Sequence, residues 1–360
     1  MQNTENRTMV NLALQGGGAH GAFTWGVLDK LLEDGRLGFE GISGTSAGAM
    51  NAVALADGWY EAQTEGARER LETFWKAISR SGNFSVTAQQ QEILDNFLSF
   101  WMWPLNAANG GADKKSGLAK LFPSASWANP FTSQVTSPYA VNPLNINPLR
   151  DVVERLVDFD RVRKCRSFKL FLAATHVHTG KIRVFTRDDV SADAVLASAC
   201  LPYAFQAVEI DGAPYWDGGY TGNPALWPFF TETDCEDIIL VQINPLKRME
   251  TPKTAQEILE RVSEVTFNAS LLREFRAIDF VNRLIDEGRL EGGTYRRNRV
   301  HRIDASEELA ALGADSKFNT SWAFFTNLRD IGREAAADFL KKNYRHIGKK
   351  GTVDLRAAFS

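Results

Sequence analysis

The feature that most constrains the fold is a strand pattern that runs through glycines into a helix pattern, and it occurs twice near the amino terminus. In the first copy, residues 9–15 predict a short buried strand, and Ala19–Glu33 carry apolar residues at helical spacing. In the second copy, a brief strand at Phe39–Ser43 leads through "SGTSAG" into a helix of small residues that ends before Gly58. Alternating units of this kind predict an α/β fold in which a mainly parallel central sheet is flanked by helices.

The later part of the chain continues with strands and then changes to long helices. Further strand patterns lie at residues 167–177, 181–186, 204–210 and 237–246. Helices are expected at Glu61–Ile78, from a capping box at Thr254 and Glu257 to about Glu287, and at Thr320–Lys342. We expect a single domain over residues 1–360, with a helical carboxyl-terminal extension at about 250–360.

Composition and charge exclude several classes of protein. The 360 residues are 44% hydrophobic and 24% charged, as in an ordinary globular domain rather than a disordered chain or a coiled coil. A net charge of -3 provides no general attraction to nucleic acid, so no nucleic-acid partner is expected. The amino terminus shows no signal-peptide pattern, and no apolar run approaches the roughly 18 residues that a membrane-spanning helix needs. We therefore expect a soluble, cytoplasmic protein.

The cysteines and histidines do not indicate a metal site. Cys165, Cys200 and Cys235 are odd in number and lack C-x-x-C spacing, which favours buried free thiols over disulfides or a thiolate site. His176 and His178 share one face of a predicted strand without neighbouring carboxylates, so they are interpreted as a strand-surface pair. No metal and no cofactor are expected.

The stretch "GTSAG" matches the G-x-S-x-G pattern and lies between a predicted strand and a predicted helix, the context of a nucleophile elbow. Gly44 and Gly48 allow the backbone to turn sharply, so that the Ser46 hydroxyl projects at the tip of the turn and the helix amino terminus stabilises negative charge. The alternative is a structural turn, because small residues are common in turns.

A serine nucleophile needs a base within hydrogen-bond reach, and the best candidate is Asp217 in "YWDGGYTGNPAL". An aspartate before two glycines, Gly218 and Gly219, is by itself more typical of a tight turn in which the carboxylate caps its own backbone. The combination with Ser46 favours the catalytic interpretation.

Three blocks of sequence, taken together, resemble the signature blocks of the patatin-like phospholipase family. They are "LALQGGGAHGAFTWGVLDKLL", "ISGTSAGAMNA" and "ASACLPYAFQAVEIDGAPYWDGGYTGNPAL", in the family's order, from about residue 10 to 226. The resemblance implies a lipid acyl hydrolase that cleaves carboxylic esters with a Ser-Asp dyad: Ser46 is the nucleophile, Asp217 is the base, and Gly16, Gly17 and Gly18 form the oxyanion hole. One departure is His20, since members often carry Arg or Lys there. An imidazole is only partly charged near neutral pH, so capping of local backbone is as good an interpretation of His20 as phosphate binding.

The chemistry of the residues agrees with what the resemblance implies. Attack of Ser46 on an ester creates an oxyanion that needs preorganised N–H donors, and each such donor contributes about 3 kcal/mol. Consecutive glycines permit the backbone to present those donors, and the resulting acyl-enzyme is hydrolysed by water. The expected partner is a lipid or another acyl ester.

Three other functions remain to be weighed. The first is a nucleotide-binding site, because the glycines at 16, 18 and 21 match the pattern G-x-G-x-x-G. A dinucleotide site also needs a carboxylate at the end of the second strand, whereas Glu40 lies near its start. A P-loop needs a Gly-Lys-Ser/Thr sequence after the turn, and none follows. A Ser-His-Asp hydrolase could use His301 or His346 as its base. A non-catalytic lipid-binding module is the third alternative.

Residues 81–147 differ from the rest of the chain, being rich in Asn, Ser, Pro and aromatic residues with weak periodicity. We interpret them as an insertion or cap. Within them, "ILDNFLSFWMWPLN" places apolar residues at helical spacing, and the aromatic segment 93–105 suits either a buried cap over the site or peripheral contact with a membrane. In both cases we expect it to shape the access of acyl chains.

Overall fold

The computed structural model describes residues 7–81 and 137–359, apart from 203, 254, 291–294, 306–307, 310–311, 313–315 and 317–318. Within these residues eight strands form one sheet in the order β5-β6-β3-β2-β1-β7-β8, and β4 pairs with β3 off that path. Most of the expected insertion at 81–147, including the aromatic segment 93–105, lies outside the described residues. The chain is described again from a short helix, α4 (Pro138–Val141).

The centre of the sheet is parallel. Its strands are β3 (Lys169–His176), β2 (Leu37–Gly44), β1 (Thr8–Leu14), β7 (Asp237–Gln242) and β8 (Arg299–Asp304). Antiparallel strands follow at the β3 end, namely β4 (Ile182–Thr186), β6 (Ala213–Asp217) and β5 (Val208–Ile210). The prediction of a mainly parallel sheet flanked by helices is confirmed.

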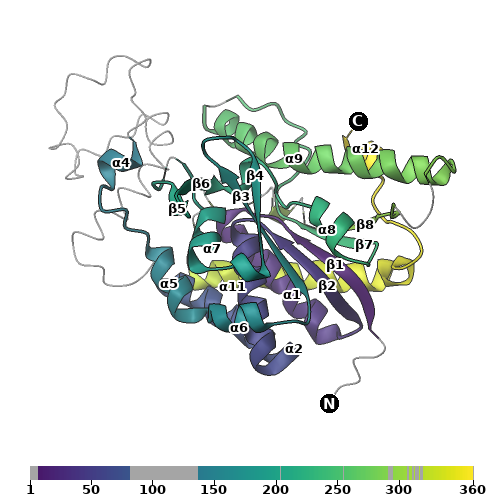
Figure 1. Ribbon diagram of the computed structural model, residues 1–360, viewed down its shortest axis with the longest axis horizontal. Coiled ribbons are helices and arrows are strands. Elements are labelled where there is room, and N and C mark those ends of the chain that lie inside the picture. Colours follow the sequence, from purple (N-terminus) through teal and green to yellow (C-terminus); the bar gives the residue numbers. More distant parts are fainter. Residues whose placement is uncertain are drawn as a thin grey trace.

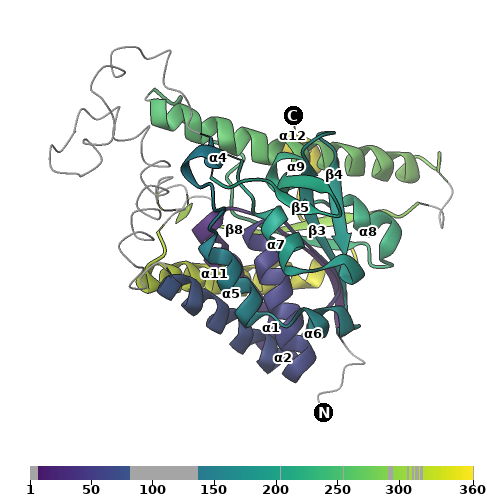
Figure 2. The ribbon, with the colours of Figure 1, turned by 60° about the vertical axis from the view of Figure 1, so that its left-hand side comes forward.

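Helices cover both faces of this sheet (Figures 1 and 2). On one face lie α1 (Gly21–Asp34), α2 (Ala47–Ser81) and α11 (Trp322–Asn343), and on the other α8 (Trp227–Glu232), α9 (Ala255–Asp286) and α12 (Leu355–Phe359). Along β1 the side chains of Leu12 and Leu14 join the first core, whereas Ala13 between them joins the second. A strand buried on both faces is apolar at nearly every position, which is why the central strands could be predicted.

Three shorter α-helices lie between α4 and β5 in the chain, two before β3 and one after β4. These are α5 (Pro148–Leu156), α6 (Phe159–Lys164) and α7 (Ala192–Ser198). Both α5 and α7 begin with a side-chain cap, since Asn147 accepts from Leu149 N–H and Ser191 accepts from Ala194 N–H. Among the described helices, none combines the length and the apolar character needed to cross a membrane.

Two expectations about helices need correction. The break expected before Gly58 lies instead at Ala62 and Gln63, where the backbone of α2 departs from helical geometry. The region 250–360 is not purely helical, because β8 extends the sheet beside β7. Its sequence "RVHRID" mixes buried with half-buried side chains and carries three charged residues, so it lacks the apolar run of a central strand. Thr254 of the expected capping box lies outside the described residues.

Candidate active site

Ser46 stands at a sharp turn between the end of β2 and the start of α2. Its φ is 54°, in the left-handed region that residues other than glycine seldom adopt. Both flanking glycines are required by close contacts: a Cβ on Gly44 would lie 2.6 Å from the Gly48 carbonyl oxygen, and one on Gly48 would lie 2.1 Å from the Leu14 carbonyl oxygen. Ser46 is half-buried between fully buried neighbours, so the strained turn presents its side chain.

The backbone of this turn is held by hydrogen bonds on both sides. Ser46 N–H donates to the Ser198 hydroxyl at 2.9 Å, and Ser198, at the end of α7, is fully buried. The Ser46 carbonyl accepts from Met50 N–H at 3.0 Å as α2 begins. Ser198 therefore fixes the nucleophile candidate from outside its own strand and helix.

Asp217 ends β6 and is 1% exposed. One of its carboxylate oxygens accepts from Gly219 N–H at 2.6 Å, so the self-capping turn does form. Burial raises the pKa of Asp217 to about 7, while the hydrogen bonds from Gly219 N–H and the Ser46 side chain act in the opposite direction. The structure thus brings Ser46 and Asp217 together, and it gives the carboxyl group a pKa at which it can both accept and return a proton near neutral pH.

The loop that follows Asp217 is fastened to the turn around Ser46. Thr45 donates its hydroxyl to the Gly222 carbonyl at 2.7 Å, and Ser43 donates to the Ala225 carbonyl at 2.6 Å. A Cβ on Gly218 would lie 3.0 Å from the Thr45 methyl carbon and 2.1 Å from the Ala173 carbonyl oxygen, so the two segments are in contact. The relative placement of Ser46 and Asp217 is therefore set by hydrogen bonds from the Thr45 and Ser43 hydroxyls to main-chain carbonyls.

The glycine loop lies on another side of Ser46. A Cβ on Gly16 would lie 2.8 Å from the Ser46 Cβ. However, Gly16 N–H donates to Asn223 Oδ1 at 2.7 Å, so that N–H is already engaged. Among the residues that the structure describes, the N–H groups of Gly17 and Gly18 have no hydrogen-bond acceptor. Gly18 is exposed and has a φ of 59°.

Two helix amino termini converge beside Ser46. α2 begins at Ala47, and α1 begins at Gly21, where a Cβ would lie 2.5 Å from the Ala47 Cβ. The amino terminus of a helix carries a partial positive charge, which stabilises a nearby anion. Both helices thus favour negative charge developing next to the serine.

His20 is buried and faces the carboxyl-terminal part of the chain. It is 2% exposed, its Nε2 lies 2.7 Å from the Ser316 hydroxyl, and its ring lies 6.3 Å from that of Phe324. The side chain does not cap α1, so the interpretation as a local backbone cap is wrong. The Ser316 contact could not be foreseen, because it joins residues almost 300 positions apart.

The two histidines considered as alternative bases lie elsewhere. His301 is fully buried in β8, with Nε2 2.9 Å from Asp237 Oδ1 and Nδ1 3.2 Å from the Thr352 hydroxyl. β8 is three strands away from β2, a separation of about 14 Å at the usual strand spacing. His346 lies two residues before Gly348, whose N–H donates to Asp237 at 3.0 Å, so it too lies beside the start of β7. Neither histidine is placed to reach Ser46.

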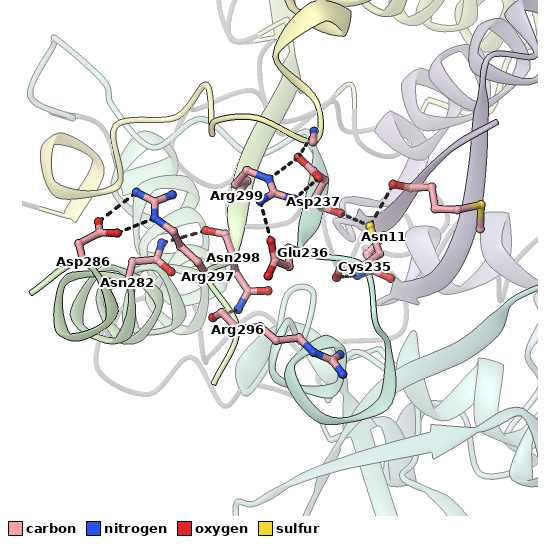
Figure 3. A network of polar contacts seen from close by, with 12 residues as sticks. Asn11, Cys235, Glu236, Asp237, Asn282, Asp286, Arg296, Arg297, Asn298 and Arg299 are labelled. Atoms are coloured by element: carbon pink, nitrogen blue, oxygen red, sulfur yellow. Dashed lines mark hydrogen bonds and ion pairs between the residues drawn. The ribbon is translucent and has the colours of Figure 1, made fainter. Parts of the chain in front are cut away.

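Asp237 belongs to a polar network at the amino-terminal ends of β7 and β8 (Figure 3). Arg299 extends between two carboxylates, donating to Asp237 at 2.8 Å and to Glu236 at 2.6 Å.

Of the three cysteines, Cys165 and Cys200 are buried, as expected. Cys235 lies at the edge of the Asp237 network and is half-buried, which corrects the expectation that all three thiols are buried.

Burial raises the pKa of Cys200 to about 12 and that of Cys235 to about 11, so both thiols stay protonated near neutral pH. The ring of His176 packs edge-to-face against the rings of both His178 and Tyr215. No group of three or more His, Cys, Asp or Glu side chains in the described part of the chain is arranged to hold a metal ion.

Comparison with known proteins gives a family and a distant structural likeness. The model of the family described as patatin-like phospholipase matches residues 12–230. No curated protein matches the chain. Among solved structures, VipD from Legionella pneumophila aligns with a TM-score of 0.40 and 16% identity, over 93% of this chain and 67% of VipD.

Proposed function

This chain belongs to the patatin-like phospholipase family, and from that premise we propose that it hydrolyses lipid esters with Ser46 as nucleophile and Asp217 as general base. Membership supports lipid acyl hydrolase activity in general. The observation that carries the finer proposal is a strained, accessible serine beside a buried carboxyl group with a pKa of about 7. That pairing supplies a nucleophile and the base it needs.

In the first half of the reaction, Ser46 Oγ attacks the ester carbonyl carbon while Asp217 takes the hydroxyl proton. The bond between the carbonyl carbon and the leaving oxygen then breaks, and Asp217 returns the proton to the leaving alcohol. A water molecule attacks the acyl-enzyme in the same way, giving its proton to Asp217, which passes it back to Ser46 Oγ. The residues return to their starting state, and no cofactor takes part.

The oxyanion of each tetrahedral intermediate is assigned to Gly17 and Gly18 N–H, with the two helix amino termini adding a favourable field. Gly16, although it lies against Ser46, has its N–H bonded to Asn223 and therefore shapes the loop instead of donating. Each donor aimed at the oxyanion contributes about 3 kcal/mol to transition-state stabilisation. Gly44 and Gly48 allow the elbow, and Gly218 and Gly219 allow the Asp217 turn.

The proposed substrate is a carboxylic ester of a phospholipid or of another lipid. We place the enzyme in the cytoplasm, with peripheral contact to a membrane through residues 93–105 when the substrate is part of a lipid surface. A substrate with a long acyl chain needs an apolar path to Ser46, and these aromatic residues have the composition for one.

The test is to profile the fatty acids that purified protein releases from a lipid extract. Ser46→Ala should abolish release while lipid binding to vesicles is retained. Ser79→Ala is the matched control, because Ser79 lies on the same helix and its hydroxyl donates to the Lys76 carbonyl, within that helix. If wild-type protein binds lipid but releases no fatty acid, the chain is a lipid-binding module and the proposal is wrong.

A further inference from the structure

Four buried carboxamide side chains gather behind the glycine loop, and we call them the carboxamide cluster: Gln15, Asn223, Asn244 and Asn268. Each is at most 3% exposed. They come from four places in the fold, namely the ends of β1 and β7, the loop after Asp217, and α9. Buried amide groups are costly unless their donors and acceptors are used, so such a cluster in a core calls for an explanation.

Gln15 joins the members of the cluster. Its Oε1 accepts from the N–H groups of Ile243 and Asn244, at 3.0 and 2.9 Å. Its Nε2 donates to the Asn223 carbonyl at 3.3 Å and to Asn268 Oδ1 at 3.1 Å. The side chain therefore fastens the end of β1 to the end of β7, to the loop after Asp217, and to α9.

The next residue, Gly16, is held from both sides by cluster members. Its N–H donates to Asn223 Oδ1 at 2.7 Å, and its carbonyl accepts from Asn244 Nδ2 at 2.7 Å. The chemistry of the partners fixes how each amide is turned, because an N–H needs an oxygen acceptor and a carbonyl needs an N–H donor. Both peptide groups that meet at Gly16 are thus fixed in orientation.

The carbonyl of Gly16 belongs to the same peptide unit as Gly17 N–H. A trans peptide is planar, and its C=O and N–H point in opposite directions. When Asn244 holds the carbonyl on one side, the N–H of Gly17 is directed to the other. A hydrogen bond to the carbonyl also polarises the peptide unit and strengthens its N–H as a donor.

We propose that Asn244 is a positioning residue that aims Gly17 N–H at the oxyanion, with Asn223 holding the preceding peptide. This inference rests on the proposed function, since it assigns a supporting group to that same site. Asn244 acts through Gly17 and does not touch the substrate.

The proposal predicts a kinetic signature that a purely structural role would not have. Negative charge on the carbonyl oxygen is absent from the bound ester and develops in the transition state, so a misaimed donor lowers kcat and leaves KM nearly unchanged. Displacement of a catalytic group by about 1 Å costs roughly a hundredfold in rate. Phosphonylation of Ser46 by a fluorophosphonate uses the same donors, and its rate should fall in parallel with kcat.

The experiment compares Asn244→Asp with Asn244→Ala, and uses Asn268→Ala as the control. Asn244→Asp keeps the shape of the side chain but replaces the donor by an acceptor that repels the Gly16 carbonyl. Asn268 is a matched residue in the same cluster; it bonds to Gln15 and to the Pro245 carbonyl and touches neither peptide of Gly16. Thermal midpoints, kcat and KM on a soluble ester, and the rate of fluorophosphonate labelling are measured for each.

In Asn244→Asp we expect kcat and the rate of labelling to fall about a hundredfold, with KM within about twofold of wild type. In Asn268→Ala the fall in kcat and in labelling should be at least tenfold smaller, at a similar loss of thermal midpoint. Equal losses of kcat in the Asn244 and Asn268 variants would overturn the proposal and leave the hydrolase function intact. If wild-type protein neither hydrolyses esters nor becomes labelled at Ser46, the proposed function itself is wrong, and the role of Asn244 falls with it. Should Asn244→Asp fail to fold, Asn244→Ala decides between these outcomes by the same measurements.

Discussion

Asp217 and Asp237 are both aspartates, both almost fully buried at 1% and 3% exposure, and they have opposite titration behaviour. Burial raises the pKa of Asp217 to about 7. Burial alone would also raise the pKa of Asp237, but hydrogen bonds from His301, Arg299 and Gly348 N–H lower it to about 2. Figure 3 shows Arg299 against Asp237, whereas among the described residues no Lys, Arg or His pairs with Asp217.

The comparison shows how the surroundings of a buried carboxylate set its pKa, and it separates the structural Asp237 from Asp217, for which we propose a reactive role. Where the fold supplies a cation, the buried carboxylate is locked in its charged form and anchors two strands. Where it supplies only N–H and O–H donors, the charged form is barely favoured, so a proton can be taken up and released during a reaction.

The largest effect that distinguishes the two aspartates should be on catalysis. Asp217→Asn should lower kcat roughly 10⁴-fold, because the base is lost while the shape of the site is kept. Asp237→Asn should leave kcat of the folded protein within about threefold, because Asp237 lies at the start of β7 whereas Ser46 follows the end of the parallel strand β2. Both are measured on a soluble ester well below the unfolding temperature of either variant. Comparable losses in the two variants would contradict the division of roles.

The second effect should be on stability, in the reverse order. Asp237→Asn should lower the free energy of unfolding by about 3 kcal/mol, because Arg299 and His301 lose a buried partner. Urea denaturation of both variants at pH 8 provides the measurement. A larger loss in Asp217→Asn than in Asp237→Asn would show that Asp217 is the structural carboxylate.

The third effect is on the pH dependence of activity. Asp217 must be ionised to take the Ser46 proton, so kcat/KM should rise about tenfold per pH unit up to about pH 7 and then level off. Asp237 stays ionised throughout this range. Because the pKa of Asp237 is lower in the folded state, its ionised form stabilises the fold at every pH above about 4, the pKa of an aspartate in the unfolded chain. This stability is lost only as the pH falls toward 2. A flat profile of kcat/KM between pH 5 and 8 would be incompatible with Asp217 as the base.

The smallest effect is on the pH dependence of stability. The raised pKa of Asp217 means that the folded state holds this proton more tightly, so its contribution is complete below about pH 4 and is lost as the pH rises through about 7. Asp217→Asn removes that dependence. Its thermal midpoint should therefore exceed that of wild type by a few degrees at pH 8, with a smaller difference at pH 5. A thermal midpoint of Asp217→Asn below that of wild type at both pH values would contradict the inference that burying the charged carboxylate of Asp217 destabilises the folded state.

The sequence was informative where the chemistry is local. The turn around Ser46 and the Asp217 turn each lie within a few residues, and the continuous apolar strands reveal a sheet buried on both faces. The carboxamide cluster could not be predicted, since Gln15, Asn223 and Asn244 meet only because β1 lies beside β7 in the folded sheet. Ser198 and Asn223 do fall within the sequence blocks that carry the family resemblance, and that position was the one available signal for them.

The strand order also sets a limit on what can be cut from this protein. The family match ends at residue 230, yet β7 begins at Asp237 and pairs with β1 in the middle of the sheet. A fragment ending at residue 230 would keep Ser46 and Asp217 but turn β1 into an open edge with unpaired backbone groups, a template for aggregation. The segment that identifies the family thus lacks the strand that pairs with β1, and we expect changes far downstream of Ser46 and Asp217 to reduce activity through the sheet.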